Sequence, residues 1–389
     1  MSLDLHANLR HALQQRAGEG NLRSLSVYDR GVDFYSNDYL GLANSCQLRH
    51  RINQLRKQQE PLPQGSTGSR LVSGNSSLTE ELEQQLAGFH GAQAGLLFSS
   101  GYAANSGLLA SIAGIGDCLI MDELIHASSV DGARLSRANK FIFRHNDPGN
   151  LRAKLIEARE SSPESAIFVA VESVYSMDGD FAPLPDLVQI CTEYDAGLIV
   201  DEAHSNGITG RHGAGSVTEL GLADQVFARI HTFGKGLGLH GAVVMGTATL
   251  REYLVNFCRP FIFSTALSAD AVLSIKAAYE LLPELDDQRE QLFSLVRHFR
   301  HLTAQSAFDW HDSNSWIQSL MIPGNDRAMT AAARLRERGF LVTAIRAPSV
   351  PPGTERIRIC LHASNSKRDV EGLFAALEER QCADVLLQA

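Results

Sequence analysis

The chain contains 389 residues, of which 44% are hydrophobic and 20% are charged, a composition that excludes a disordered or collagen-like protein. The 35 Lys and Arg residues are outnumbered by 44 Asp and Glu residues, which gives a net charge of −9. This balance argues against a general nucleic-acid-binding protein, because such proteins need a basic face. The length predicts two or three structural units.

The cysteines and the N-terminus indicate the compartment. Six cysteines are scattered along the chain without a C-x-x-C pair, a pattern that favours a reducing compartment over a disulfide framework or a cysteine zinc site. Residues 1–16 are polar and contain no apolar run of the signal-peptide type. No stretch approaches the ~20 apolar residues that span a membrane. We therefore expect a soluble cytoplasmic protein.

The first expected elements are a helix and a strand in an N-terminal segment, residues 1–43. Short apolar runs then alternate with helical patterns, which is typical of a mainly parallel sheet covered on both faces. Seven strands are expected at 95–98, 118–121, 141–144, 166–172, 197–201, 228–232 and 242–245. Helices are expected between several of them, at 105–112, 151–159 and 186–194. The predicted fold class is α/β, with this seven-stranded sheet in a large domain at 44–278.

The pattern changes after about residue 279. Strands are expected at 316–321, 340–345 and 356–361, and helices at 328–338 and 368–379. This alternation predicts a smaller α+β domain over residues 279–389.

Several common motifs fail on their context. The run 236–241 satisfies G-x-G-x-x-G, but a strand follows it where a dinucleotide fingerprint opens a helix. The phosphate loop G-x-x-x-x-G-K-[ST], the zinc motif H-E-x-x-H and the nucleophile elbow G-x-S-x-G are absent from the sequence. The histidines show no metal-ligand spacing, so we expect neither a metal site nor serine hydrolase chemistry.

Two segments combine the residue types that pyridoxal phosphate (PLP) chemistry needs. Asp201 closes one expected strand and is followed by His204, while Lys235 lies between two glycines after another strand. A lysine amine forms a Schiff base with PLP, and a carboxylate beside the ring nitrogen keeps the ring protonated. The small-residue turn at 99–105 precedes a helix and suits the phosphate. The chain has only six lysines, so these residues together predict a PLP site.

As a set, these segments resemble the α-oxoamine synthases, fold-type I PLP enzymes that condense an amino acid with an acyl thioester and release carbon dioxide. The resemblance runs from about residue 22 to 378. The matching segments are 36–42, 65–74, 100–105, 126–128, 145–147, 172–180, 201–204, 232–236 and 348–358.

The resemblance implies a role for each catalytic residue. Lys235 matches the Schiff-base lysine, and Asp201 matches the partner of the pyridine nitrogen. His126 matches the histidine stacked on the ring, whereas His204 and Ser176 match the partners of its phenolic oxygen.

The phosphate contacts follow in the same way. The amides of Gly101 and Tyr102, with the hydroxyl of Thr232, resemble the phosphate cradle. Ser264 and Thr265 resemble phosphate contacts from a second subunit, which implies a homodimer with shared active sites. The alternative for these two residues is ordinary loop capping.

Four further residues match substrate positions. Arg358 resembles the arginine that binds the amino-acid carboxylate. Arg23 and Ser349 lie where the family meets its acyl substrate, although Arg23 belongs to a variable terminus. Asn37, in the shared segment 36–42, is assigned to substrate binding.

Within the family, the segments 176–180, 232–236 and 344–351 are most similar to the members that act in biotin synthesis. Those members join L-alanine to a pimeloyl thioester, carried by coenzyme A or an acyl-carrier protein, and give 8-amino-7-oxononanoate, carbon dioxide and free thiol. The loop 65–70 also resembles serine palmitoyltransferase and 5-aminolevulinate synthase, so these and 2-amino-3-oxobutyrate CoA ligase remain alternatives. A non-catalytic partner subunit is disfavoured because such relatives typically lack the lysine.

Overall fold

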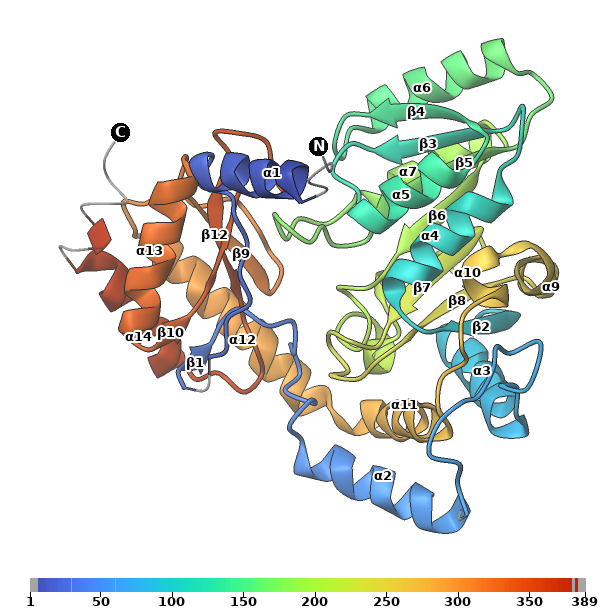
Figure 1. Cartoon of the computed structure of the whole chain (residues 1–389), viewed down its shortest axis with the longest axis horizontal. Helices are drawn as coiled ribbons and strands as arrows, with labels where there is room; N and C mark the ends of the chain where they lie inside the picture. The colour runs from blue at the N-terminus through green and yellow to red at the C-terminus, as the bar shows by residue number, and fades with distance from the viewer. Residues whose placement is uncertain (1–5, 29, 60, 380–381, 384–389) are drawn as a thin grey trace, which may run out of the picture. The chain divides into compact units, whose positions relative to one another are not determined.

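The computed structural model describes residues 6–28, 30–59, 61–379 and 382–383 (Figure 1). The chain divides into two compact units. The large unit consists of Asn37–Ser176 and Phe181–Glu290, and the small unit of the residues up to Ser36, Met177–Asp180 and the residues from Gln291 onward. The short segment Met177–Asp180 therefore leaves the large unit in the middle of its sequence and returns to it.

The large unit is built on a seven-stranded sheet with the order β2-β8-β7-β6-β5-β3-β4. Its strands are β2 (Ala94–Phe98), β3 (Cys118–Asp122), β4 (Asn139–Phe143), β5 (Ile167–Glu172), β6 (Gly197–Asp201), β7 (Ala228–Thr232) and β8 (Ala242–Gly246). Only β8 runs antiparallel to its neighbours, β2 and β7, and every other pair is parallel. The mainly parallel, seven-stranded sheet expected from the apolar runs is confirmed.

Strand residues alternate between two hydrophobic cores, one on each face of the sheet. In β3, Leu119 and Met121 belong to the core that includes α4 and α5, whereas Cys118 and Ile120 belong to the core that includes α6 and α7 (Figure 1). Because successive side chains of a strand point to opposite faces, a strand buried on both faces must be apolar throughout.

The helices of the large unit follow the order of the chain. They are α2 (Cys46–Gln59), α3 (Ser77–His90), α4 (Gly101–Ile112), α5 (Ala127–Leu135), α6 (Pro148–Ser161), α7 (Leu184–Glu193), α8 (Ser216–Glu219), α9 (Ala248–Phe257), α10 (Arg259–Ile262) and α11 (Ala269–Leu281). Short 3-10 turns occupy Arg211–Gly213 and Leu282–Glu284, and α12 (Asp286–Thr303) follows at the boundary between the units.

The small unit contains two sheets where the sequence predicts three simple strands. β9 (Ile317–Met321), β12 (Arg356–Cys360) and β11 (Thr343–Ile345) form an antiparallel sheet, while β1 (Val32–Asp33) pairs in parallel with β10 (Phe340–Leu341). The prediction of a single strand at 340–345 is therefore wrong, because two strands, β10 and β11, occupy this segment. The consecutive residues Leu341 and Val342 are both buried, which an alternating strand on one core does not allow, and the chain changes sheets there.

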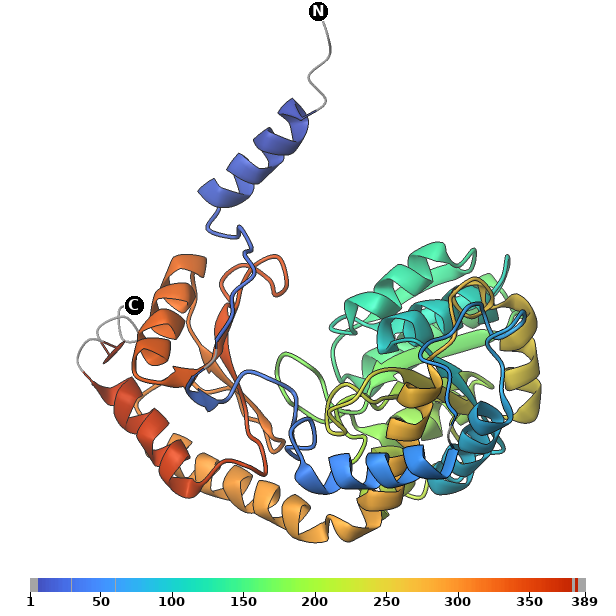
Figure 2. The ribbon, with the colours of Figure 1, turned by 60° about the horizontal axis from the view of Figure 1, so that its bottom comes forward.

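Three more helices complete the small unit. α13 (Asn325–Glu337) contacts β10, β11, β12 and α14 (Lys367–Glu378). α1 (Ala7–Gly18) has no buried residue and extends away from the other elements of the small unit (Figure 2). In the described ranges, no helix combines the length and apolar character that crossing a membrane requires.

Candidate active site

The carboxyl ends of β5, β6 and β7 meet at one cavity of the large unit, with a volume of about 280 Å³. Ligands of open α/β sheets bind at this edge. Seven of the predicted site residues line the cavity: Asn37, Gly101, Tyr102, His126, Asp201, Thr232 and Lys235.

The predicted lysine and histidine are in direct contact. Lys235 Nζ lies 2.8 Å from His204 Nε2, and His204 Nδ1 lies 2.7 Å from the Tyr39 hydroxyl. Tyr39 donates its one proton to Asn37 Oδ1 at 2.9 Å, so the Tyr39 oxygen accepts the Nδ1–H of His204. This assignment leaves Nε2 as the acceptor that faces Lys235, and Tyr39 therefore orients the histidine toward the lysine.

Asp201 is held by two donors. Its Oδ1 accepts the backbone N–H of Ala203 at 2.9 Å, and its Oδ2 accepts Nδ2 of Asn105 at 2.6 Å. Asn105 comes from α4 and is 4% exposed, a polar side chain on a helix face that otherwise packs in a core. The sequence analysis missed Asn105 as a partner, although a lone amide on an apolar helix face is a usable signal.

His126 caps the N-terminus of α5. Its Nδ1 accepts the backbone N–H of Ser128 at 3.2 Å and lies 2.7 Å from the Ser128 hydroxyl. Burial lowers the pKa of His126, and the positive charge of Lys235 lowers it further, against the opposing effect of Asp201. The imidazole is therefore a neutral ring in the cavity wall at neutral pH.

The start of α4 forms a cradle for an anion. Ser100 caps this helix by accepting the N–H of Ala103 on its Oγ at 3.1 Å, while the N–H groups of Gly101 and Tyr102 precede the helical hydrogen bonds. A Cβ atom at Gly101 would lie 2.5 Å from Cγ2 of Thr232, so glycine is needed for this close approach. The first N–H groups of a helix have no acceptor within the helix, so they suit a phosphate group. The residues present fit PLP.

Four predicted cofactor residues lie outside the lining of this cavity, and one of them, His204, contacts Lys235 directly. Ser176 is half-buried after β5, and its backbone N–H, rather than its hydroxyl, donates to Glu172 in the cavity wall. Ser264 and Thr265 line a separate cavity of about 20 Å³ together with Arg70. The chain itself therefore does not bring Ser264 and Thr265 to Lys235.

The remaining predicted substrate residues belong to the small unit. Arg23 donates from Nη2 to the Ser349 hydroxyl at 3.0 Å, which joins two residues that are far apart in the sequence. Arg358 lies in β12 and is paired in register with Ser319 of β9. These contacts place Arg23 and Ser349 together within one unit.

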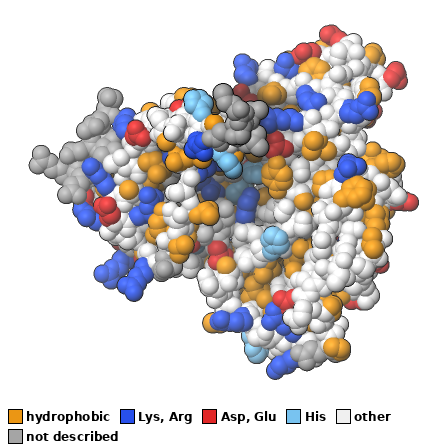
Figure 3. All heavy atoms as spheres, in the orientation of Figure 1, with side chains coloured by type: hydrophobic (Ala, Val, Ile, Leu, Met, Phe, Trp, Pro, Cys, Tyr) orange, Lys and Arg blue, Asp and Glu red, His pale blue; other side chains and the backbone are white. Residues whose placement is uncertain are grey.

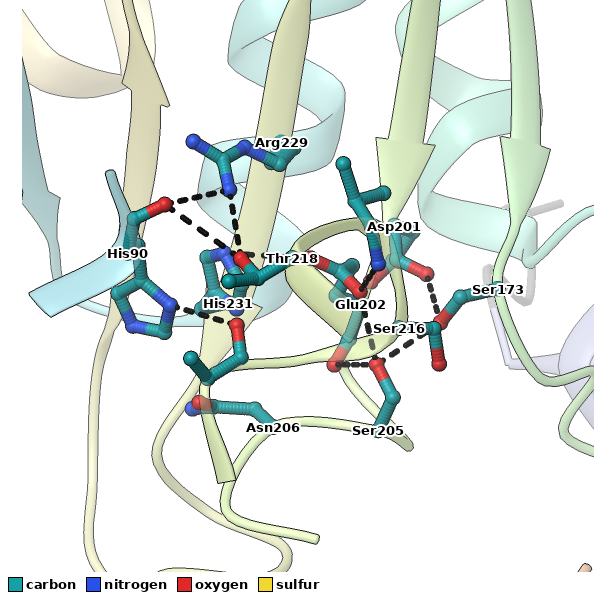
Figure 4. A network of polar contacts seen from close by, with 12 residues as sticks. His90, Ser173, Asp201, Glu202, Ser205, Asn206, Ser216, Thr218, Arg229 and His231 are labelled. Carbon is teal, nitrogen blue, oxygen red and sulfur yellow. Dashed lines mark hydrogen bonds and ion pairs between the residues drawn. The ribbon is translucent and has the colours of Figure 1, made fainter. Parts of the chain in front are cut away.

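A buried polar network lies next to the cavity and was not predicted from the sequence (Figure 4). Asn206 donates from Nδ2 to the backbone oxygen of Thr232 at 3.0 Å. Glu202 accepts the N–H of Val217 at 2.9 Å and the hydroxyl of Ser205 at 3.2 Å. Burial raises the pKa of Glu202 to about 7. The network ties the loop after β6 to β7, the strand that precedes Lys235.

Residues 29–377 match the aminotransferase class I and II family. The chain belongs to this family. It is 44% identical to the 8-amino-7-oxononanoate synthase of Emericella nidulans, with 96% of this chain and 95% of that protein aligned. It is 41% identical to the enzyme of the same name from Methylococcus capsulatus, with 90% and 88% aligned.

Solved structures of related proteins share the fold. The serine palmitoyltransferase of Sphingomonas wittichii has a TM-score of 0.89 at 27% identity, with 98% of this chain and 99% of that chain covered. A serine palmitoyltransferase of S. paucimobilis with bound PLP–myriocin aldimine has a TM-score of 0.89 at 26% identity, with 99% of each chain covered. The 8-amino-7-oxononanoate synthase of Francisella tularensis has a TM-score of 0.75 at 25% identity, with 92% and 98% covered. The expected fold-type I architecture is confirmed.

Proposed function

We propose that the protein is a PLP-dependent C-acyltransferase of biotin biosynthesis. It condenses L-alanine with a pimeloyl thioester and releases 8-amino-7-oxononanoate, carbon dioxide and free thiol. The observation that carries this proposal is that Lys235 contacts His204 and lines the same cavity as Asp201. It occurs in a chain that is 44% identical, over almost its whole length, to an 8-amino-7-oxononanoate synthase.

Different cavity residues bind different parts of the cofactor. When bound, PLP supplies an electron sink for negative charge at the α-carbon of the amino acid. Lys235 provides the amine that attaches to it, and Asp201 holds the proton on the pyridine nitrogen. The amides of Gly101 and Tyr102, with the hydroxyl of Thr232, bind the phosphate.

Lys235 also moves the proton of the substrate. Its Nζ must be a neutral amine to take the proton from the α-carbon. His204 Nε2 accepts a hydrogen bond from Nζ and so holds the amine in place. With PLP bound, Ser176 and His204 would hold its phenolic oxygen, and His126 would cover its ring as a neutral imidazole.

Substrate binding is assigned to four residues. A guanidinium group binds a carboxylate through two parallel hydrogen bonds, and Arg358 supplies it for the amino acid. Asn37 lines the cavity and contacts the same substrate. Arg23 and Ser349, which are hydrogen-bonded to each other, meet the acyl thioester.

We place the protein in a cytoplasmic homodimer in which Ser264 and Thr265 reach the phosphate of the partner's site. All six cysteines are free, which supports a reducing compartment. Large hydrophobic side chains are exposed on the large unit near α9 (Figure 3), and Phe257 and Phe263 are 60% and 71% exposed. Such surfaces are typical of interaction sites.

The shared site is tested by mixing two inactive variants. A Lys235→Ala subunit and a subunit carrying both Ser264→Ala and Thr265→Ala form, on exchange, a dimer with one intact site. We expect thiol release to recover in the mixture, whereas sites confined to single subunits give no recovery. Sedimentation of each variant alone checks that dimers form.

The substrate assignment is tested by thiol release from pimeloyl-coenzyme A by the PLP-loaded protein, with L-alanine, glycine or L-serine. Release with alanine alone supports the proposal. The second candidate is a serine palmitoyltransferase, favoured by the TM-score of 0.89 to enzymes of that name. It predicts release only with serine and a palmitoyl thioester, and that outcome would replace the proposed reaction.

A further inference from the structure

Glu172 is a buried carboxyl group in the wall of the cavity that no role described above uses. It ends β5, is 2% exposed and lines the cavity. In the register of the sheet it lies directly beside Asp201 of β6. Neighbouring strands are about 4.8 Å apart, so two carboxyl groups lie next to each other at the edge where the cofactor binds.

The two oxygens of the Glu172 carboxyl group differ in their surroundings. Hydrogen bonding from the backbone N–H of His126, just before α5, and from that of Ser176, in the loop after β5, lowers the pKa of its carboxyl group. Its Oε1 is buried and has no hydrogen-bond partner within the described part of the chain. A buried acceptor without a donor is costly, whereas a protonated oxygen at this place becomes a donor that can face a ligand in the cavity.

The surroundings also decide its charge. The groups that face Glu172 are Asp201 on β6, Lys235 after β7, His126 before α5 and Tyr175 after β5. Burial and the negative charge of Asp201 raise the pKa of Glu172 to about 8, while Lys235 acts in the opposite direction. Two adjacent carboxyl groups do not both ionise easily. Glu172 is therefore the member of the pair that keeps its proton at pH 7.

We propose that Glu172 is a positioning residue that works as a neutral acid. It holds the loops of His126 and Ser176 by their backbone N–H groups, directs its own O–H into the cavity, and leaves Asp201 as the one negative charge beside the cofactor ring. This proposal rests on PLP binding as proposed above and is independent of which acyl thioester the protein uses.

The test compares Glu172→Gln with Glu172→Ala. Glutamine keeps an acceptor for the two N–H groups and a donor toward the cavity without a charge, whereas alanine removes both. We expect the PLP affinity of E172Q to stay within about threefold of the wild type and that of E172A to fall by about tenfold or more, the effect of one lost buried hydrogen bond. Glu164→Gln, an exposed change just before β5, is the matched control.

The measurement is titration of the apoprotein with PLP, followed by absorbance at pH 7. An E172Q protein that loses as much affinity as E172A overturns the proposal, because a charged carboxylate would then be required.

A second measurement needs no cofactor and does not depend on the folding of E172A. The infrared difference spectrum of wild-type apoprotein minus E172Q at pH 7 isolates the carboxyl group of Glu172. We expect the C=O band of a protonated acid, which converts to carboxylate bands as the pH rises through the pKa of Glu172. Carboxylate bands already present at pH 7 contradict the proposal.

The two proposals fail in distinguishable ways. If the wild-type protein binds PLP but releases no thiol with alanine and pimeloyl-coenzyme A, the substrate assignment fails and the role of Glu172 stands. If Glu172 is ionised in the infrared spectrum while thiol release with alanine is fast, the role of Glu172 fails and the proposed function stands.

Discussion

Two polar regions lie at the ends of β6 and β7: the cavity and the buried network. They differ in what their buried polar groups contact. Asp201 lines the cavity with both oxygens held by donors, while the next residue, Glu202, is 0% exposed in the network of Figure 4. Consecutive residues of a strand face opposite sides of the sheet. Asp201 therefore faces the cavity, whereas Glu202 faces the buried network. The cavity groups are arranged to meet a ligand, and the network groups meet one another.

The network is built largely from neutral groups. His90 Nδ1 donates to the backbone oxygen of Ala214 at 3.0 Å, and its ring stacks on His231 with centroids 3.8 Å apart. Burial lowers the pKa of His90 to about 3 and that of His231 well below its usual value. Arg229 donates to the backbone oxygen of His90 at 2.8 Å. Glu202, 3.5 Å from His231 Nε2, is the carboxyl group whose charge changes near neutral pH.

The largest expected effect lies in the cavity. Lys235→Ala removes both the amine that holds the cofactor and the base that takes the substrate proton, so we expect thiol release to fall by roughly 10³-fold or more. Lys57→Ala, an exposed change on α2, is the control and should release thiol at the wild-type rate. Wild-type turnover in K235A would contradict the assignment of the lysine.

The next effect probes the network through pH. The folded-state pKa of Glu202 is raised to about 7, so the stability that its neutral form contributes is fully present below the unfolded value near 4.5 and is lost as the pH rises toward 7. Over this range the wild type should lose about 3 kcal/mol relative to Glu202→Gln, which cannot ionise. Urea unfolding of both proteins at pH 5 and pH 8 measures the difference.

Glu164→Gln should show no such pH dependence, because this side chain is exposed. A constant difference between wild type and E202Q across the pH range would show that Glu202 ionises in the folded protein as it does in the unfolded chain.

Asn105→Ala tests how Asp201 is held in the cavity. It removes the 2.6 Å hydrogen bond to Asp201, and a hydrogen bond to a charged group is worth about 2 kcal/mol, so PLP affinity should fall roughly thirtyfold. Titration of the apoprotein with PLP measures this change. Unchanged affinity would mean that Asp201 keeps its orientation through Ala203 alone.

Tyr39→Phe is expected to have the smallest effect. It removes the acceptor of the His204 Nδ1–H, which costs about 1 kcal/mol and should lower kcat roughly fivefold while KM for alanine is unchanged. Steady-state thiol release resolves the two constants, with the exposed Tyr35→Phe as the control. An effect on KM alone would assign Tyr39 to substrate binding instead of to His204.

Much of the sheet was predictable because its strands are apolar on both faces. All seven strands of the large unit were expected from their apolar runs, with ends shifted by a residue or two. The break between β10 and β11 was not, because Phe340–Ile345 is uniformly apolar apart from Thr343 and a local pattern does not show which partner each half pairs with. The same limit hid Asn105, whose value depends on Asp201 lying opposite it.

The sequence by itself determined the chemistry of the site: the short list of lysines, the aspartate at a strand end and the small-residue turn before α4 are local features. The tertiary structure alone decided which groups meet. The order of the strands places Glu172 beside Asp201, and folding brings Tyr39 to His204 and Arg23 to Ser349. The reason is physical, because residue type and spacing govern local structure, whereas contacts between distant residues depend on how the strands pair and how both faces of the sheet are packed.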